Sequence, residues 1–394
     1  MKIPQRFSIL LTCFGAVMIH GNSFAGDSAA LLSVSITNGT PVVPRSMFTQ
    51  TWTFTNNGTT TWTAGPNGYT LDMVGLDSLG AIPLITNASG TYHFPRAAIN
   101  SGKSVAPGGT ASYSMEFIAP EASGSYTDSF ALNGTTFFAP TVTVQVAVEP
   151  GGNTNVFDRA RTISYANNYA AYVASDGYFW TNSDYPDFGY YGTNVFTPVP
   201  TMDTANDCAH FVSCCIGNEP HDRGGGINIP SRTSPTYGEP GAGNIVNAVL
   251  VNPGYAVEVS SLSQLEPGDV VGWNWEGDTS VSNLDHVTLY MGNGLLASHA
   301  VSALDVDFAY FETDISVYHL IHILDYPPLW TSRSGTKTTF SWTTNWNNYA
   351  LYSATNLKGP WAKVSTSPTK KGVTNSVTLT MPGSGSAFYR LEMP

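Results

Sequence analysis

Residues 206–217 read Asn-Asp-Cys-Ala-His-Phe-Val-Ser-Cys-Cys-Ile-Gly, and this stretch decides the fold of the central part of the chain. Apolar residues recur at positions 208, 211, 212, 215 and 216, the spacing of one buried helix face. Asp207 is a favourable N-cap and Gly217 a favourable stop, so the pattern predicts a helix that begins at Cys208. Exposed N–H groups and the helix dipole in the first turn favour the nucleophilic thiolate. The alternative is that Cys208 is simply a small buried apolar residue.

Two histidines follow in a predicted β-hairpin. Residues 285–291 alternate between polar and apolar, and Asn293-Gly294 is a strong signal for a two-residue hairpin turn. With that loop, residue 288 opposes residue 299, which places His286 and His299 diagonally on the same face. A three-residue loop would reverse the parity and favour Ser298. We predict His299.

A thiol at a helix start, an imidazole that opens a strand and a polar group on the neighbouring strand are the parts needed for acyl transfer through a thioester. We predict Cys208 as the nucleophile, His286 as the base and His299 as the residue that orients His286. The Cys208 backbone N–H would receive the oxyanion. A zinc site made by these three residues is the alternative on ligand type, but the helix-start geometry favours the thiolate. His210 and most other histidines are predicted to be ordinary satisfied polar groups.

Residues 1–25 predict a secretory signal peptide. Lys2 and Arg6 precede an apolar segment, and Ser23-Phe24-Ala25 is typical of a cleavage site. No later run reaches the roughly 18 apolar residues that a transmembrane helix needs. We therefore expect an exported protein, either secreted or held in the periplasm or at the cell surface.

The cysteine count agrees with a thiol enzyme in an oxidising compartment. Of the four cysteines, Cys13 leaves with the signal, and the remaining three cannot all pair within one chain. Cys208 is the natural candidate for the thiol left over. Cys214 and Cys215 could form a strained adjacent disulfide, but two packed reduced thiols are favoured.

The rest of the chain is too long for one core and predicts several domains. Residues 26–149 contain short alternating segments broken by Gly, Pro and Asn turns, as in a β-sandwich. Residues 150–155 have linker composition. Residues 156–325 hold the cysteine helix and the hairpin, and residues 329–394 return to short strand-like segments.

Charge is distributed unevenly between these regions. Residues 155–328 carry 20 acidic and 4 basic side chains, so this region should repel nucleic acid and anionic membranes. Residues 329–394 carry 7 basic side chains and 1 acidic one, and could contact an anionic surface. A solvated lysine face is the simpler explanation, and it is the one we favour.

Residues 156–325 resemble the amidase domain of the NlpC-type, papain-like superfamily of cysteine peptidases and amidases. The resemblance rests on four segments: residues 161–170, 207–213, 265–271 and 285–287. It implies an α+β fold and hydrolysis of amide bonds in cell-wall (peptidoglycan) or similar peptides, without a cofactor.

The resemblance also assigns roles to single residues. It makes Cys208 the nucleophile, His286 the base and His299 the third residue, and it implies that Asp207 contacts a free amino terminus of the substrate. His210 and Cys214 depart from the family, which usually has Asn and Gln at these positions. The third residue also falls one place later than in many relatives.

The two flanking regions resemble known β-domains. Residues 52–62, with Pro107-Gly108-Gly109 and Gly124-Ser125-Tyr126, resemble the tryptophan-bearing Ig-like domain of autophagy cargo receptors and many bacterial exported proteins. That resemblance implies a binding or spacer module in which Trp52 and Trp62 belong to the core. Residues 329–394 resemble a small C-terminal β-sandwich of exported proteins, which implies attachment or a structural cap.

We therefore expect a multidomain, monomeric protein with an N-terminal all-β Ig-like sandwich, a central α+β papain-like (NlpC-type) domain and a C-terminal small all-β sandwich. Its expected activity is that of a cysteine amidase or peptidase. The competing function is a non-catalytic adhesion, carbohydrate-binding or protein-binding protein with a degenerate amidase domain. A transpeptidase with the same three residues is a third possibility.

Overall fold

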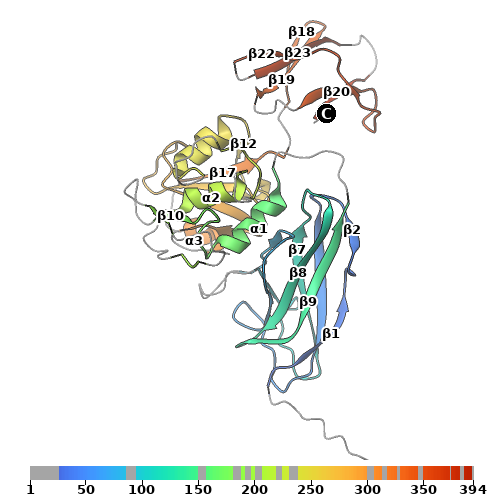
Figure 1. Cartoon of the computed structure of the whole chain (residues 1–394), viewed down its shortest axis with the longest axis vertical. Helices are drawn as coiled ribbons and strands as arrows, with labels where there is room; N and C mark the ends of the chain where they lie inside the picture. Colours follow the sequence, from blue (N-terminus) through green and yellow to red (C-terminus); the bar gives the residue numbers. More distant parts are fainter. Residues whose placement is uncertain are drawn as a thin grey trace, which may run out of the picture.

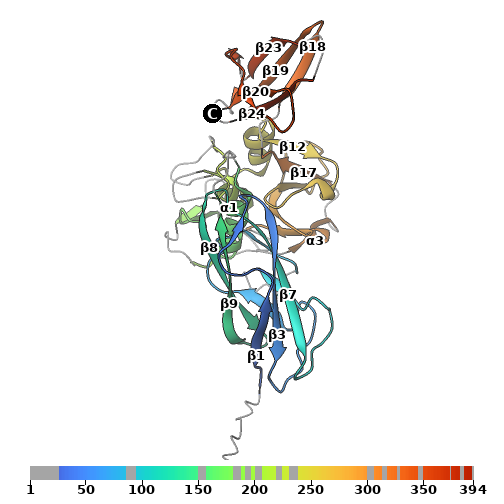
Figure 2. The same ribbon diagram turned by 90° about the vertical axis from the view of Figure 1, so that its right-hand side faces the viewer.

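The chain forms three bodies that follow one another along its long axis, as Figure 1 and the turned view in Figure 2 show. The computed structural model describes residues 26–85, 95–149, 157–180, 188–190, 197–199, 206–218, 224–229, 238–299, 306–312, 317–325, 329–344, 349–372, 374–381 and 386–392. The predicted signal peptide and the predicted linker lie outside these residues. No helix in these ranges has both the length and the apolar character needed to cross a membrane.

The N-terminal body consists of two β-sheets packed face to face. One sheet has the order β1-β3-β7-β5 and the other the order β2-β9-β8-β4-β6. Trp52 and Trp62 are fully buried between them, as predicted, and the Trp52 ring lies 4.9 Å from the Phe130 ring. The strands of the first sheet are Ala29–Val34 (β1), Met47–Asn56 (β3), Ala81–Ile82 (β5) and Thr110–Ile118 (β7). Those of the second are Thr40–Val42 (β2), Thr70–Met73 (β4), Arg96–Ala98 (β6), Gly124–Asn133 (β8) and Phe137–Val148 (β9).

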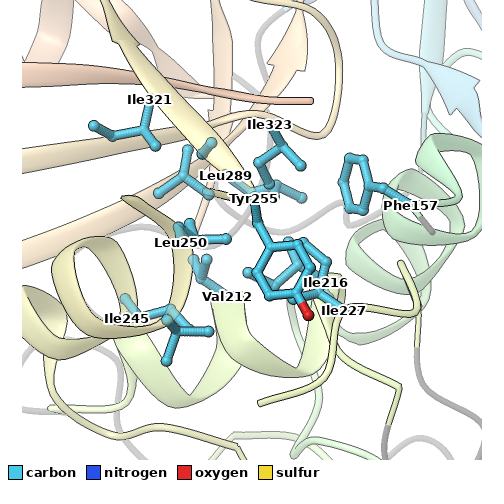
Figure 3. Packing of buried hydrophobic residues seen from close by; sticks show 14 of the residues in the cluster. Phe157, Val212, Ile216, Ile227, Ile245, Leu250, Tyr255, Leu289, Ile321 and Ile323 are labelled. Carbon is cyan, nitrogen blue, oxygen red and sulfur yellow. The ribbon is translucent and has the colours of Figure 1, made fainter. Parts of the chain in front are cut away.

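The central body is built on a six-stranded antiparallel sheet of order β12-β17-β13-β14-β15-β16. One face packs against three helices through the cluster shown in Figure 3, and the other face carries Trp273 and a short helix. The strands are Ala256–Val259 (β12), Val270–Asn274 (β13), His286–Gly292 (β14), Leu295–Ala297 (β15), Val306–Asp307 (β16) and Val317–Ile323 (β17). The helices are Arg159–Tyr169 (α1), Cys208–Ile216 (α2), Asn244–Val251 (η1, a π-helix) and Phe308–Glu312 (α3). The central body also contains the 3-10 turn Leu262–Gln264 (η2). A separate two-stranded hairpin is formed by Tyr178–Trp180 (β10) and Phe188–Tyr190 (β11).

Helix α1 is shorter than its sequence pattern predicts. An apolar stripe of Ala160, Ile163, Ala166, Ala170 and Val173 predicts a helix from Asp158 to Ala174. Asp158 caps the helix by accepting the Arg161 backbone N–H, but the helix ends at Tyr169. Tyr172 pairs with Pro198 in an isolated β-bridge, so the chain has already left the helix there. Alanines can continue an apolar stripe beyond the last turn, and the tertiary pairing overrides that local preference.

The first body is joined to α1 by polar contacts. The Asp77 side chain accepts a hydrogen bond from Asn167 Nδ2 at 2.6 Å, and the Asp77 backbone exchanges two bonds with the Asn168 side chain. Gly80 lies so close to α1 that a Cβ atom there would be 2.8 Å from Ala160 Cα. The N-terminal body and the central body therefore share a tightly fitted contact.

A buried ion-pair network joins α1 to the central sheet, near the start of β13 and the end of β17. The Arg159 guanidinium contacts Asp269 at 2.9 Å, Asp325 at 3.0 Å and Glu266 at 3.2 Å, and it also donates to the Pro267 carbonyl. Asp269 is fully buried and also accepts the backbone N–H groups of residues 266 and 323. The sequence of residues 264–273 predicts a turn that leads into a strand. The network explains why the Pro267-Gly268-Asp269 segment of this turn carries an aspartate.

His322 adds a pH-dependent contact to this network, because its Nδ1 lies 2.8 Å from Asp269. The hydrogen bond to Asp269 raises the pKa of His322 above its ordinary value of 6.5. The contact should therefore stabilise the fold fully below about pH 6.5 and lose its effect as the pH rises through the raised pKa. We expect the free energy of unfolding of the wild type to exceed that of His322→Leu by a margin that shrinks between pH 6 and pH 9, measured by urea denaturation. A margin that is constant with pH would contradict this role.

The C-terminal body is a small all-β domain of two sheets, with the orders β18-β19-β23-β22 and β21-β20-β24. Its buried residues include Phe340, Trp342, Leu351 and Val377. All five of its lysines are exposed, as expected for a solvated lysine face. The strands are Trp330–Ser334 (β18), Lys337–Thr343 (β19), Ala350–Ala354 (β20), Ala362–Lys363 (β21), Thr369–Lys371 (β22), Thr374–Thr380 (β23) and Phe388–Glu392 (β24).

Candidate functional site

Cys208 is the first residue of α2, as predicted, and its side chain faces the central sheet. The backbone N–H groups of Val287, Ala209 and Cys208 itself lie close enough to the sulfur to lower its pKa, and the residue is 3% exposed. One of these donors belongs to β14, so the sulfur lies between the start of the helix and the start of the strand. The helix position supplies N–H donors for a sulfur anion, in agreement with the sequence argument.

The thiol is nevertheless neutral in this conformation. Burial raises the pKa of Cys208 to about 11, and the neighbouring Asp207 carboxylate adds to the rise, although the Val287 N–H opposes it. Desolvation of the thiolate therefore outweighs the favourable helix position.

This pKa leads to a direct prediction for thiol reactivity. Without substrate, alkylation of Cys208 by iodoacetamide should be slow at pH 7 and should rise about tenfold per pH unit up to pH 10, because only the thiolate reacts. The rate is followed by mass spectrometry of the peptide that contains Cys208. His286→Ala should leave the profile unchanged. A plateau that begins near neutral pH and disappears in His286→Ala would show that the thiolate and an imidazolium are already paired.

His286 is the first residue of β14. Its side chain lies on the face of the sheet that carries α3, opposite to the face that packs against α2. Its ring is stacked on Phe311 at 5.5 Å and lies 5.6 Å from the Trp275 ring. Burial lowers the pKa of His286 to about 3, so the ring is neutral. Within the described part of the chain, its Nε2 atom is buried without a hydrogen-bond partner, and no hydrogen bond joins it to Cys208.

His299 does not lie beside His286, which corrects the predicted register. Asn293 and Gly294 form the expected turn with positive φ angles of 54° and 77°. A bulge lies in the strand just before this turn, between Tyr290 and Gly292. Leu289 then pairs with Ala297, so extending the register places residue 299 opposite residue 287. The bulge adds one residue to one strand and reverses the faces of all residues beyond it.

The same register places Ser298, and not His299, on the His286 side of the sheet. His299 packs instead against α2, with its ring stacked on Phe211 at 4.2 Å. Its Nε2 lies 3.0 Å from the Tyr169 carbonyl oxygen. The structure therefore brings Cys208 close to the strand that carries His286, but it leaves His299 outside a catalytic triad.

Asp207 binds protein groups on both of its carboxylate oxygens. Oδ1 accepts the Trp180 backbone N–H at 2.9 Å and contacts His210 Nδ1 at 2.9 Å, and Oδ2 contacts His299 Nδ1 at 2.5 Å. Burial alone would raise the pKa of Asp207, but the two histidines lower it below its ordinary value. The residue occupies the N-cap position without capping the helix through its side chain. Because it is fully buried, the structure does not support the expected contact with a substrate amine.

A second polar cluster, which the sequence argument missed, lies one turn further along α2. His210 Nε2 lies 3.0 Å from Asp176 Oδ2 and 3.6 Å from Cys214 Sγ, and all three residues are buried. Burial would lower the pKa of His210, but the charges of Cys214, Asp176 and Asp207 raise it well above 6.5. The spacing of four between His210 and Cys214 places both on one helix face, and together with their departure from the family pattern it could have revealed the pair.

The three cysteines in the described part of the chain carry free thiols. Cys208, Cys214 and Cys215 are all buried in this state, which agrees with the predicted packing of reduced thiols. Among the described residues, the set whose ligand atoms come close enough to hold a metal ion is Asp176, His210 and Cys214. The alternative zinc site of Cys208, His286 and His299 is not assembled.

Comparison with known proteins identifies the first body. Residues 35–148 match the family model described as the Ig-like domain from next to BRCA1 gene. The N-terminal domain is Ig-like. No curated protein sequence matches the chain.

Solved structures add only remote similarities. AvmM, which catalyses macrocyclization in alchivemycin A biosynthesis, is 8% identical with a TM-score of 0.22, over 32% of this chain and 91% of AvmM. PapD-like domain 7 of human CEP192 is 12% identical with a TM-score of 0.18, over 38% of this chain and 99% of that domain. Scores this low carry no argument about function.

Proposed function

We propose that the chain is an exported cysteine amidase or peptidase that hydrolyses amide bonds in cell-wall peptides or related peptides. Cys208 forms the thioester and His286 acts as its base. The observation that carries the proposal is the position of the Cys208 sulfur at the start of α2, near enough to the backbone N–H of Val287, the residue next to His286, for that N–H to lower the pKa of the thiol. Nucleophile and base thus come from the adjoining ends of one helix and one strand.

The state of His286 supports its role as base. A buried polar atom without a hydrogen-bond partner costs about 1–3 kcal/mol, so such an atom calls for a functional explanation. The Nε2 atom of His286 is in this state within the described residues. A neutral imidazole can accept a proton, but burial lowers the pKa of His286 to about 3, so the ring becomes an effective base only when it leaves this buried position.

The reaction requires one movement within the site. The His286 ring lies on the Phe311 face of the sheet, opposite to the face that α2 covers, so it must swing around the start of β14 to reach the Cys208 sulfur and accept the thiol proton. The sulfur then attacks the substrate carbonyl carbon, and His286 returns the proton to the departing amine as the C–N bond breaks. Water then attacks the carbonyl carbon of the thioester while His286 accepts its proton. The C–S bond breaks, and His286 returns the proton to the Cys208 sulfur. The Cys208 and Ala209 N–H groups, at the start of the helix, are available to the developing oxyanion.

A non-catalytic binding function is the second candidate, and one observation favours it. The raised pKa of Cys208 and the lowered pKa of His286 keep both groups neutral in this conformation. An activated cysteine usually has a lowered pKa. On this alternative, the Ig-like domain would contribute the binding and the central domain would be a degenerate amidase.

Incubation of the full chain, without its signal peptide, with defined muropeptides and with non-wall peptides separates the candidates. Mass spectrometry should find new amino and carboxyl termini at one kind of amide bond, and an added amine acceptor distinguishes transfer from hydrolysis. A preference for muropeptides would identify the wall as the substrate. Complete recovery of every peptide, at several pH values, would support the binding protein.

A further inference from the structure

We propose that Asp176, His210 and Cys214 supply three of the four ligands of a structural metal site for zinc or a similar divalent first-row ion. The site is separate from the Cys208 and His286 pair and requires no catalytic activity. Asp176 lies between α1 and β10, while His210 and Cys214 project from neighbouring turns of α2. A metal ion at this point would join the helix that carries Cys208 to the segment that leads into β10.

The ligand types and spacing fit such an ion. Carboxylate oxygen, imidazole nitrogen and thiolate sulfur are the three ligand types that zinc takes in proteins. The three ligand atoms all lie within 4.8 Å of one another, with 3.0 Å between Asp176 Oδ2 and His210 Nε2, and 3.6 Å between His210 Nε2 and Cys214 Sγ. Bonds of about 2.0–2.3 Å in a tetrahedral centre separate ligand atoms by roughly 3.3–3.7 Å. Only small side-chain adjustments are therefore needed.

Hydrogen bonding alone explains this arrangement less well. His210 Nε2 is close to both Asp176 and Cys214, and a single N–H can point at only one of them. A metal ion on the nitrogen lone pair would bind all three groups at once. It would also compensate the aspartate, which is 3% exposed, and a thiolate at Cys214, which is 1% exposed.

The surroundings of His210 match those of a metal ligand. Histidines that bind a metal usually donate their second ring N–H to a carboxylate or a carbonyl, which fixes the tautomer and the ring orientation. His210 Nδ1 makes this contact with Asp207 at 2.9 Å. Asp207 is held in turn by the Trp180 N–H and by His299. Asp176 is fixed by the Tyr178 N–H, which donates to its other oxygen.

Metal binding can be measured directly on the full chain, purified with a reductant and without chelator. We expect about one zinc ion per chain by elemental analysis. After removal of the zinc by a chelator, Co²⁺ should restore one equivalent and produce a thiolate-to-cobalt charge-transfer band. Cys214→Ser should remove that band, whereas Cys208→Ser and Cys215→Ser, the matched cysteine controls, should retain it. Asp207→Asn should weaken zinc binding by about 10- to 100-fold.

A second comparison covers the case in which a single variant does not fold. The double variant His210→Asn, Cys214→Gln carries the residues usual in the related amidases and should fold without metal. A chelator should lower the melting temperature of the wild type and leave that of the double variant unchanged. The proposal fails if the reduced wild type binds neither zinc nor cobalt, or if the charge-transfer band survives in Cys214→Ser. A folded wild type without metal would leave His210 as a hydrogen-bonded imidazolium between two carboxylates.

Discussion

Replacement of Cys208 by alanine should lower the rate of amide hydrolysis by about 10³-fold or more. The proposed reaction passes through a thioester, so removal of the sulfur removes the attacking atom and not merely a contact. Loss of a nucleophile in this class of mechanism leaves only the residual catalysis that binding and oxyanion contacts supply. The rate is measured as peptide product formed per unit time on the substrate that the peptide screen identifies.

Cys215→Ala is the matched control for this substitution. Cys215 is also buried on α2 and also carries a thiol, but it lies two turns from the helix start. Its replacement should leave kcat/KM within a few fold of the wild type. Equal loss of activity in both variants would point to damage to the helix, and retained activity in Cys208→Ala would exclude the thioester.

Replacement of Arg159 by methionine should destabilise the chain by about 3–5 kcal/mol. The substitution keeps an apolar side chain of similar length but removes the guanidinium from Asp269, which is fully buried and, among the described residues, then keeps only His322 as a titratable partner. An uncompensated buried charge accounts for a cost of this size. Burial would lower the pKa of Arg159, but Asp269 and its neighbours raise it, so the guanidinium stays charged. Urea denaturation followed by tryptophan fluorescence measures the change.

Arg161→Met provides the comparison, because Arg161 lies on the exposed side of the same helix. Its replacement should change the free energy of unfolding by about 0.5 kcal/mol or less. Similar losses in both variants would mean that helix α1, and not the buried pair, sets the cost.

Local patterns predicted the elements of the central domain well. The apolar spacing between Cys208 and Ile216 predicted α2 with the correct bounds, because one helix face is buried against the sheet. Asn293-Gly294 predicted the hairpin turn, because both residues must adopt positive φ angles. The N-terminal domain was predicted from its alternating strands and its two buried tryptophans.

The arrangement of the site could be predicted only in part. A two-residue turn predicts the strand register only if no bulge follows it, and the bulge near Met291 exchanges the faces of Ser298 and His299. Asp207 was expected to cap its own helix, but its partners Trp180 and His299 are 27 and 92 residues away. Contacts over such distances depend on the packing of whole elements, so neither the approach of Asp176 to His210 nor the packing of Asp207 follows from local spacing.

The most direct test of the thioester is the mass of the acyl-enzyme. The protein is mixed with substrate peptide, quenched with acid within one turnover and measured intact, and the adduct is then located by peptide mapping. The account predicts a mass increase equal to the acyl part of the peptide, attached to Cys208 in the wild type and in Cys215→Ala, and absent from Cys208→Ala. An adduct on another residue, or cleavage without any adduct in Cys208→Ala, would contradict it.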